Sequence, residues 1–186
     1  YHGEPMFHPN YGPSDIYSEN ELTNLWAHYA AEAELVDRWL GRVLQKLDDL
    51  DLWDDSLVII TSDHGMSIGE HGRTGKSNIW ESDKRFWPIY PEIAHVPFLI
   101  AGGELPQGVN RNFWAQAADI LPTCCDLAGI TITPSEPLNG RSFAQALMHG
   151  ESHREHIVSG CHIKPKDGKI PPRATMPCLY KDSWAY

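Results

Sequence analysis

Cysteine is scarce in this sequence, and the few that occur lack the spacing of a metal site or a disulfide framework. The chain has four cysteines among 186 residues, and no Cys-x-x-Cys pair. So sparse a set is not typical of a zinc-binding module or of a small secreted domain held by disulfides. We interpret the four thiols as core or incidental; they are Cys124, Cys125, Cys161 and Cys178.

Long apolar runs and basic clusters are also lacking. No stretch approaches the roughly 20 apolar residues that cross a bilayer, so no membrane span is expected. The formal charge is -10 and the sequence pI ≈ 5.4, and the basic residues are scattered, which argues against a nucleic-acid partner. No charged-then-apolar leader opens the chain. Because Tyr1 is not a natural start, we expect further sequence upstream, and both the compartment and the oligomeric state stay open.

What the sequence does contain is one sharp junction, in Ser56–Lys76, between an apolar run and a polar, glycine-rich segment. Leu57–Ile60 is apolar and mostly β-branched, which favours a strand buried on both faces, as in a parallel sheet. Asp63, His64 and Gly65 would follow the carboxyl end of this strand, with the glycine allowing a turn. That end is the usual ligand site of open α/β sheets, so an acid and an imidazole there could reach a metal or a substrate.

A long amphipathic helix is predicted before this junction. Ser18 and Glu21 have the spacing of a capping box, which marks a helix start. From Leu22 to Leu47 apolar residues recur at steps of three and four. This period predicts a helix of about 28 residues, or some 42 Å, whose apolar stripe would lie across a sheet.

The order of the remaining segments predicts an α/β fold. Further strands are expected at Val96–Ala101, Trp114–Ala118, Ile157–Ser159 and Cys178–Tyr180, and further helices at Asp119–Gly129 and Ser142–Met148. Gly65–His95 lacks clean periodicity and is predicted to be a functional loop. Its Arg73, Lys76, Lys84 and Arg85 form a local basic excess on an acidic chain, as an anionic substrate would require.

Several short motifs together resemble the sulfatase family of the alkaline phosphatase superfamily. In chain order they are Thr61-Ser62-Asp63-His64-Gly65, Gly69-Glu70-His71-Gly72, Gly75-Lys76, His95-Val96-Pro97, Asp119-Ile120-Leu121-Pro122-Thr123 and Asn139-Gly140-Arg141-Ser142. The resemblance covers roughly residues 18–160 and rests on the combination, since each string alone is weak. It implies the C-terminal half of an alkaline-phosphatase-like mixed sheet flanked by helices, over residues 1–150. Residues 151–186 would then begin a small C-terminal domain with an antiparallel sheet.

The resemblance also implies a divalent-metal hydrolase that acts on a small anionic ester. Asp63 and His64 would be two metal ligands, and Lys76 would contact the anionic oxygens of the substrate. The spacing between Asp63 and Lys76 matches the branch that has Asp-His at the metal, which sulfatases share with phosphonate monoester hydrolases. A metal and a lysine beside a tetrahedral anion neutralise charge that develops in the transition state. His71 would orient a ligand or the loop, or would make only a structural hydrogen bond.

The nucleophile that the family carries is not found in this sequence. Sulfatases have a cysteine or serine within Cys/Ser-x-Pro-x-Arg that becomes formylglycine, and none of the four cysteines begins that motif. We therefore expect a fragment whose partner is the N-terminal part of the same enzyme. The implied metal is calcium, because family sites are rich in carboxylate oxygens. An imidazole ligand favours manganese or zinc instead, and these remain alternatives.

Three functions follow from these observations. The leading hypothesis is a fragment of a sulfatase that hydrolyses sulfate esters through formylglycine. The second is a phosphonate monoester or phosphodiester hydrolase of the same superfamily, and comparing an aryl sulfate with an aryl phosphonate as substrate would separate the two. The third is a non-catalytic scaffold that keeps the fold without the nucleophile, and the sequence upstream of Tyr1 would decide it.

Overall fold

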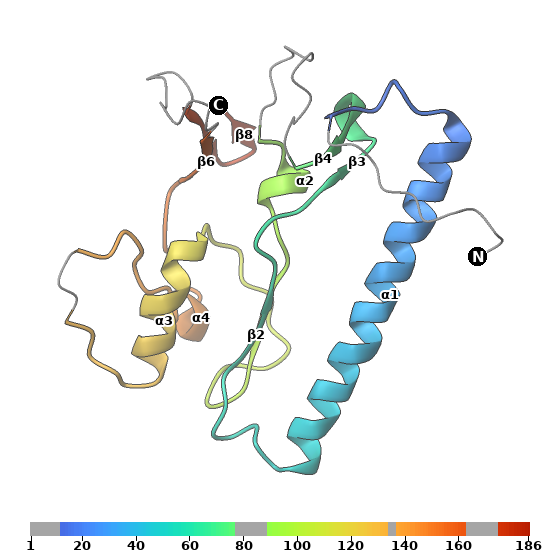
Figure 1. Ribbon diagram of the computed structural model, residues 1–186. Helices are drawn as coiled ribbons and strands as arrows, with labels where there is room; N and C mark the ends of the chain where they lie inside the picture. The colour runs from blue at the N-terminus through green and yellow to red at the C-terminus, as the bar shows by residue number, and fades with distance from the viewer. Residues whose placement is uncertain (1–11, 77–88, 134–136, 163–174) are drawn as a thin grey trace. The chain divides into compact units, whose positions relative to one another are not determined.

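The computed structural model describes residues 12–76, 89–133, 137–162 and 175–186 (Figure 1). The fold is mixed α/β, as predicted. The chain divides into two units, Tyr1–Trp53 with His64–Phe98, and Asp54–Asp63 with Leu99–Tyr186. The division expected from the sequence, at residue 150, stays a prediction. Lys84 and Arg85, which belong to the predicted basic excess, lie outside the described residues.

The first unit is dominated by the helix α1, Glu19–Asp49 (Figure 1). Its start is the predicted capping box: the Glu21 N–H donates to Ser18 Oγ at 3.3 Å, and the Ser18 N–H donates to Glu21 Oε2 at 2.7 Å. Beyond its C-terminal end, Trp53 Nε1 donates to Asp48 Oδ1 at 2.5 Å. The helix has 31 residues, so the predicted length was nearly right.

The apolar stripe of α1 is buried only near the N-terminal end. Leu25 is 5% exposed, and Trp26 Nε1 donates to Ile68 O at 2.6 Å, which ties the helix to the strand β3, Ser67–Ile68. Farther along the same stripe, Tyr29, Val36 and Val43 are exposed. In the described structure, burial of the stripe is thus confined to the N-terminal end of the helix. Periodicity shows that residues share one face of a helix, but it does not show what covers that face.

A three-stranded antiparallel sheet is built from short strands around the predicted loop. The strands are β1, Gly12–Pro13, β3, and β4, Arg73–Gly75, in the order β1-β4-β3. A 3-10 helix, Glu70–Gly72, connects β3 to β4. The sequence prediction of a loop was wrong here, because strands of two or three residues are too short to show alternation. Lys76 follows β4 directly.

The strands β2, Val58–Thr61, and β5, Phe98–Ala101, pair with each other, and both confirm predicted strands. Their burial differs from the prediction. The first three residues of β2 are half-buried, and Thr61 and Leu99 are exposed. Burial on both faces needs neighbouring strands and covering helices, and within the described ranges β2 is hydrogen-bonded to β5 alone.

The core of the second unit surrounds α4, Ala144–His149. Phe143, Ala146 and Leu147 are buried there, and they pack against Ile100, Leu105, Phe113, Ala115 and Leu127. The helix α3, Ile120–Leu127, lies beside α4, and both helices confirm predictions. The strand predicted at Trp114–Ala118 is wrong, because a 3-10 helix, Ala117–Asp119, begins within it. The Asp119 carboxylate accepts from the Gln116 N–H at 2.9 Å, which forms part of the capping box that starts this 3-10 helix.

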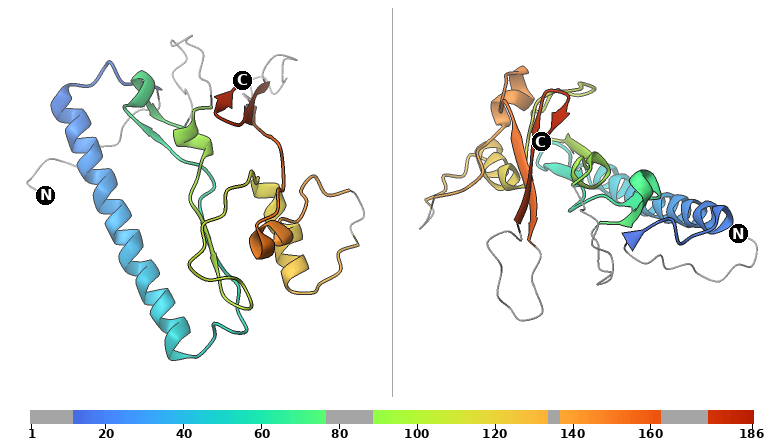
Figure 2. Two further views of the ribbon diagram at one scale, coloured as in Figure 1. Left: turned by 180° about the vertical axis from the view of Figure 1, so that it is seen from behind. Right: turned by 90° about the horizontal axis from the view of Figure 1, so that it is seen from above.

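A second antiparallel sheet ends the chain. It contains β6, Ile157–His162, β7, Thr175–Lys181, and β8, Trp184–Ala185, in that order. Figure 2 shows β6 and β7 side by side. Their antiparallel register places Val158 opposite Leu179. The two strands predicted from short apolar runs are thus confirmed and are longer than expected. None of the helices in the described ranges combines the length and apolar character needed to span a membrane.

Candidate active site

The strand β2 ends at Thr61, two residues before Asp63, and Gly65 then passes very close to the helix α2, Pro91–Ala94. The Gly65 N–H donates to Ile93 O at 2.7 Å. A Cβ placed on Gly65 would lie 1.9 Å from Glu92 O, far inside van der Waals contact. Gly65 is not among the residues with positive φ. Glycine is required here because two backbones approach closely, and not because the turn is left-handed.

The imidazole of His64 is held in a single tautomer. Its Nδ1 lies 2.9 Å from Gly65 O, and its Nε2 lies 2.7 Å from Lys76 Nζ. A carbonyl oxygen only accepts, so Nδ1 carries the proton and donates it. An ammonium only donates, so Nε2 accepts. This is the form in which histidine binds metals, with one nitrogen oriented by a backbone carbonyl and the other offering its lone pair.

The sheet, more than the loop, brings Lys76 to His64. Lys76 is exposed, but it follows β4, whose Arg73 and Thr74 are buried. β4 is hydrogen-bonded to β1 on one side and β3 on the other, so its end is held by strand register. The predicted anion contact therefore lies beside a predicted metal ligand, with its ammonium against the nitrogen that a metal would use.

The donor set fits a metal in kind but is not complete among the residues that the structure describes. Asp63 is exposed and directly precedes His64, and the boundary between the two units passes between them. Across the described ranges no three side chains of His, Cys, Asp or Glu come together as a metal site. Calcium takes about six to eight oxygen ligands. A site at Asp63 and His64 would thus need further ligands.

His71 contacts α2 and the residue before it. Its backbone is left-handed, with φ 55° and ψ 21°. Its Nε2 donates toward both carboxylate oxygens of Glu92, each at 3.3 Å, since a carboxylate can only accept. Its ring stacks on Tyr90, with 3.8 Å between centroids and 7° between planes. The sequence analysis did not single out Glu92 or Tyr90. Both lie in the aperiodic segment Gly65–His95, and that position was the one sequence feature that could have drawn attention to them.

A second polar cluster lies in the second unit, around the fully buried Asp119. Its carboxylate accepts hydrogen bonds from Arg154 Nε at 2.9 Å, Arg154 Nη2 at 2.5 Å, the Arg141 N–H at 2.9 Å, the Gln116 N–H at 2.9 Å and His153 Nε2 at 3.2 Å. Burial raises the pKa of Asp119, but these donors, led by Arg154, outweigh it and keep the pKa well below its usual range. The carboxylate in turn raises the pKa of Arg154.

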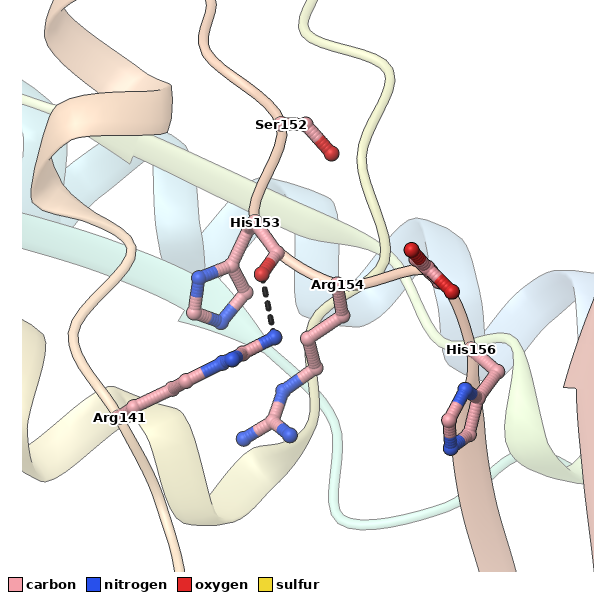
Figure 3. A pocket seen from close by; sticks show the side chains of 6 residues that line it. Arg141, Ser152, His153, Arg154 and His156 are labelled. Atoms are coloured by element: carbon pink, nitrogen blue, oxygen red, sulfur yellow. Dashed lines mark hydrogen bonds between the residues drawn. The ribbon is translucent and has the colours of Figure 1, made fainter.

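The same cluster borders a pocket of about 510 Å³, lined by Arg141, Ser152, His153, Arg154, Glu155 and His156 (Figure 3). Figure 3 shows the Arg141 guanidinium directed at the main chain of His153, where Nη2 donates to the carbonyl oxygen. Arg154 is likewise engaged by Asp119. Both guanidinium groups are bound to other parts of the same unit, Arg141 to the His153 carbonyl and Arg154 to Asp119, so we interpret this cluster as structural.

Comparison with known proteins establishes the family. The sulfatase family model matches residues 2–130. The chain belongs to the sulfatase family. The ordered motifs that resembled sulfatases are thereby confirmed as a family signal. A divalent metal is general in this superfamily, and its identity is not indicated by the family alone.

Two curated relatives and one solved structure illustrate what the chain is similar to. It is 31% identical over 139 residues to arylsulfatase K of Mus musculus, which covers 75% of this chain and 23% of that protein. It is 31% identical over 148 residues to the multifunctional alkaline phosphatase superfamily protein PehA of Trinickia caryophylli, covering 78% and 26%. The phosphonate monoester hydrolase of Agrobacterium radiobacter matches with a TM-score of 0.67 and 27% identity, over 89% of this chain and 36% of that one. The chain thus spans about a quarter of the length of these curated relatives.

Proposed function

We propose that this chain contributes part of the active site of a sulfatase that hydrolyses sulfate esters. The observation that carries the proposal is the arrangement at His64, where a neutral imidazole presents Nε2 to the Lys76 ammonium at 2.7 Å. Asp63 directly precedes this histidine. An acid, an imidazole lone pair and a lysine in one place are what binding a metal beside an anionic ester requires.

Each of these residues has a distinct proposed role. Asp63 and His64 would hold the divalent metal, with calcium as the first expectation and manganese or zinc as alternatives. When bound, the metal supplies Lewis acidity toward the oxygens of the ester. Lys76 would then exchange His64 Nε2 for the anionic oxygens of the sulfate, where its charge offsets the negative charge of the transition state.

The nucleophile would come from sequence outside this chain. None of the four cysteines begins Cys-x-Pro-x-Arg, so formylglycine would be supplied by the N-terminal part of the same enzyme. This expectation agrees with the share of the curated relatives that the chain spans, 23% and 26% in the two compared above. In the proposal, the Asp63–Lys76 segment supplies metal ligands and charge, while attack on the ester depends on the missing part.

A second candidate is hydrolysis of phosphonate monoesters or phosphodiesters. It is supported by the similarity to PehA and to the phosphonate monoester hydrolase of Agrobacterium radiobacter. Both substrate classes present a tetrahedral anion, so the same lysine and metal would contact either one. Turnover of an aryl sulfate and of an aryl phosphonate therefore has to be compared in one preparation.

The test uses the full-length protein with Asp63→Ala and His64→Ala, beside Asp55→Ala and His149→Ala as exposed controls of the same residue types. Metal content is measured by elemental analysis, and kcat/KM is measured on p-nitrophenyl sulfate and on p-nitrophenyl phenylphosphonate. We expect the site variants to lose bound metal and to lose about 10²-fold or more in kcat/KM, while the controls match wild type.

Three results are informative. Wild-type metal content and turnover in both site variants would refute the assignment of Asp63 and His64. A preference for the phosphonate over the sulfate would favour the second candidate. No turnover of either ester by the intact wild-type protein with its metal bound would favour a non-catalytic scaffold.

A further inference from the structure

The helix α2 contacts two segments that lead to the candidate site. On one side, Ile93 O accepts a hydrogen bond of 2.7 Å from the N–H of Gly65, the residue that follows His64. On the other side Glu92 accepts from His71 Nε2 at 3.3 Å to each carboxylate oxygen. One turn of helix therefore contacts the chain both just after His64 and just before β4, which ends at Lys76.

His71 needs such a contact because its backbone is in a conformation that non-glycine residues avoid. Its φ of 55° is left-handed, and Gly69 and Gly72 on either side also have positive φ, 125° and 68°. For a residue with a Cβ this conformation costs about 1–2 kcal/mol. The stacking on Tyr90 and the bond to Glu92 are the interactions through which His71 is held in place.

The exposure of the His71–Glu92 pair limits its contribution to the stability of the fold. The two side chains are 39% and 35% exposed. Ion pairs this exposed contribute only about 0–1 kcal/mol to stability. The contact is thus a weak source of global stability, and its reach is local: it joins the 3-10 helix Glu70–Gly72, which leads into β4, to α2.

The point where this 3-10 helix enters β4 determines where Lys76 lies. β4 is only three residues long, and its residues are buried between β1 and β3. Because β4 is short and hydrogen-bonded on both sides, a displacement at Arg73 would also displace Lys76. His64 is tied to the same helix through Gly65, so the 2.7 Å between His64 Nε2 and Lys76 Nζ depends on α2 from both directions.

We infer that Glu92, with Tyr90 stacked on its partner His71, is a positioning residue that sets the separation of His64 and Lys76. The inference rests on the proposed function for its catalytic consequence, although the geometry it concerns is present without metal or substrate. No bond joins Glu92 to His64 or to Lys76 in the interactions described above, so Glu92 acts through His71 and through the main chain of α2.

The test compares Glu92→Ala and Glu92→Gln in the full-length protein. Glutamine keeps an oxygen that accepts from His71, so it should rescue what alanine loses. Glu104→Ala and Asp55→Ala each remove an exposed acid elsewhere; both serve as matched controls. The measurements are kcat and KM on the better of the two aryl esters, calcium affinity by calorimetry, and the ¹⁵N spectrum of the His64 imidazole in metal-free protein, assigned with His64→Ala.

We expect Glu92→Ala to lower kcat about 10- to 100-fold, as displacing groups that support a metal site does, and to shift the His64 ¹⁵N signals. Glu92→Gln should lie near wild type, and the controls should match it. A wild-type kcat together with an unchanged His64 spectrum in Glu92→Ala would overturn the inference. If alanine prevents folding, a His71→Ala variant that keeps the wild-type kcat and His64 spectrum would overturn it, because that variant removes the same contact from the other side.

Failure of the proposed function gives a different result. In that case wild-type protein would bind no metal and hydrolyse neither ester. The His64 spectrum of metal-free Glu92→Ala would still decide whether Glu92 positions the imidazole.

Discussion

Replacing Gly65 by alanine tests the close approach on which the candidate site depends. The added Cβ would lie 1.9 Å from Glu92 O, whereas contacts of a Cβ under 3.0 Å essentially never occur. The obstructing atom belongs to the main chain of α2, so it cannot rotate away as a flexible side chain would. Either α2 or the segment after His64 must move by about 1 Å, the difference between those two distances.

The expected loss follows from two terms. Forcing an extra carbon into a packed contact costs about 1–3 kcal/mol. The Gly65 N–H also donates to Ile93 O at 2.7 Å, and separating the two backbones weakens this hydrogen bond, which is worth about 1 kcal/mol. Alanine also lowers the conformational entropy of the unfolded chain, which offsets the loss of stability by at most about 1 kcal/mol. We therefore expect the free energy of unfolding to fall by about 1–4 kcal/mol.

Gly41→Ala is the matched control for this experiment. Gly41 lies inside α1, and nothing comes within 4 Å of a Cβ placed there. Alanine should therefore stabilise the helix by about 0.5–1 kcal/mol. Urea unfolding followed by circular dichroism and tryptophan fluorescence measures both variants. A neutral or stabilising Gly65→Ala, like the control, would refute the close approach of α2 to Gly65.

Three further predictions concern stability. Asp119→Asn breaks the buried pair with Arg154 and should cost about 3–5 kcal/mol by urea unfolding at pH 7. Because the folded-state pKa of Asp119 is lowered, the stabilisation is complete above the unfolded pKa of about 3.9 and is lost as the pH falls toward the folded pKa. The difference between wild type and Asp119→Asn should thus shrink between about pH 4 and pH 2, and a constant difference would contradict the assignment. Ser18→Ala removes the cap of α1 and should cost about 1 kcal/mol with a matching loss of helical ellipticity; no change would count against the capping box. Ser67 Oγ is buried without a hydrogen-bond partner among the described residues, so Ser67→Ala should leave thermal stability unchanged or raise it by up to about 1 kcal/mol, and a large loss would reveal a partner.

Local signals in the sequence predicted most of the elements. The capping box at Ser18, the three- and four-residue apolar steps after it, and the β-branched run before Asp63 act through neighbouring residues, and each leads to the expected helix or strand. The strand predicted at Trp114–Ala118 failed for a reason that is also local, since a 3-10 helix with an Asp119 capping box begins at Ala117.

The candidate site was only partly predictable. Asp63, His64 and Lys76 could be singled out from motif order, and the structure brings the last two together. Glu92 could not be found in this way, because its contact with His71 joins residues 21 positions apart and has no periodic signature.

The sequence by itself predicted which residues would carry the chemistry and determined where the main helices and strands lie, because side-chain type, capping and hydrophobic period are local properties. Only the tertiary structure decided the tautomer of His64, the need for glycine at position 65 and the place of Lys76 at the end of a held strand. These depend on which distant backbones meet, and close approach between α2 and Gly65 is a contact that no local pattern encodes.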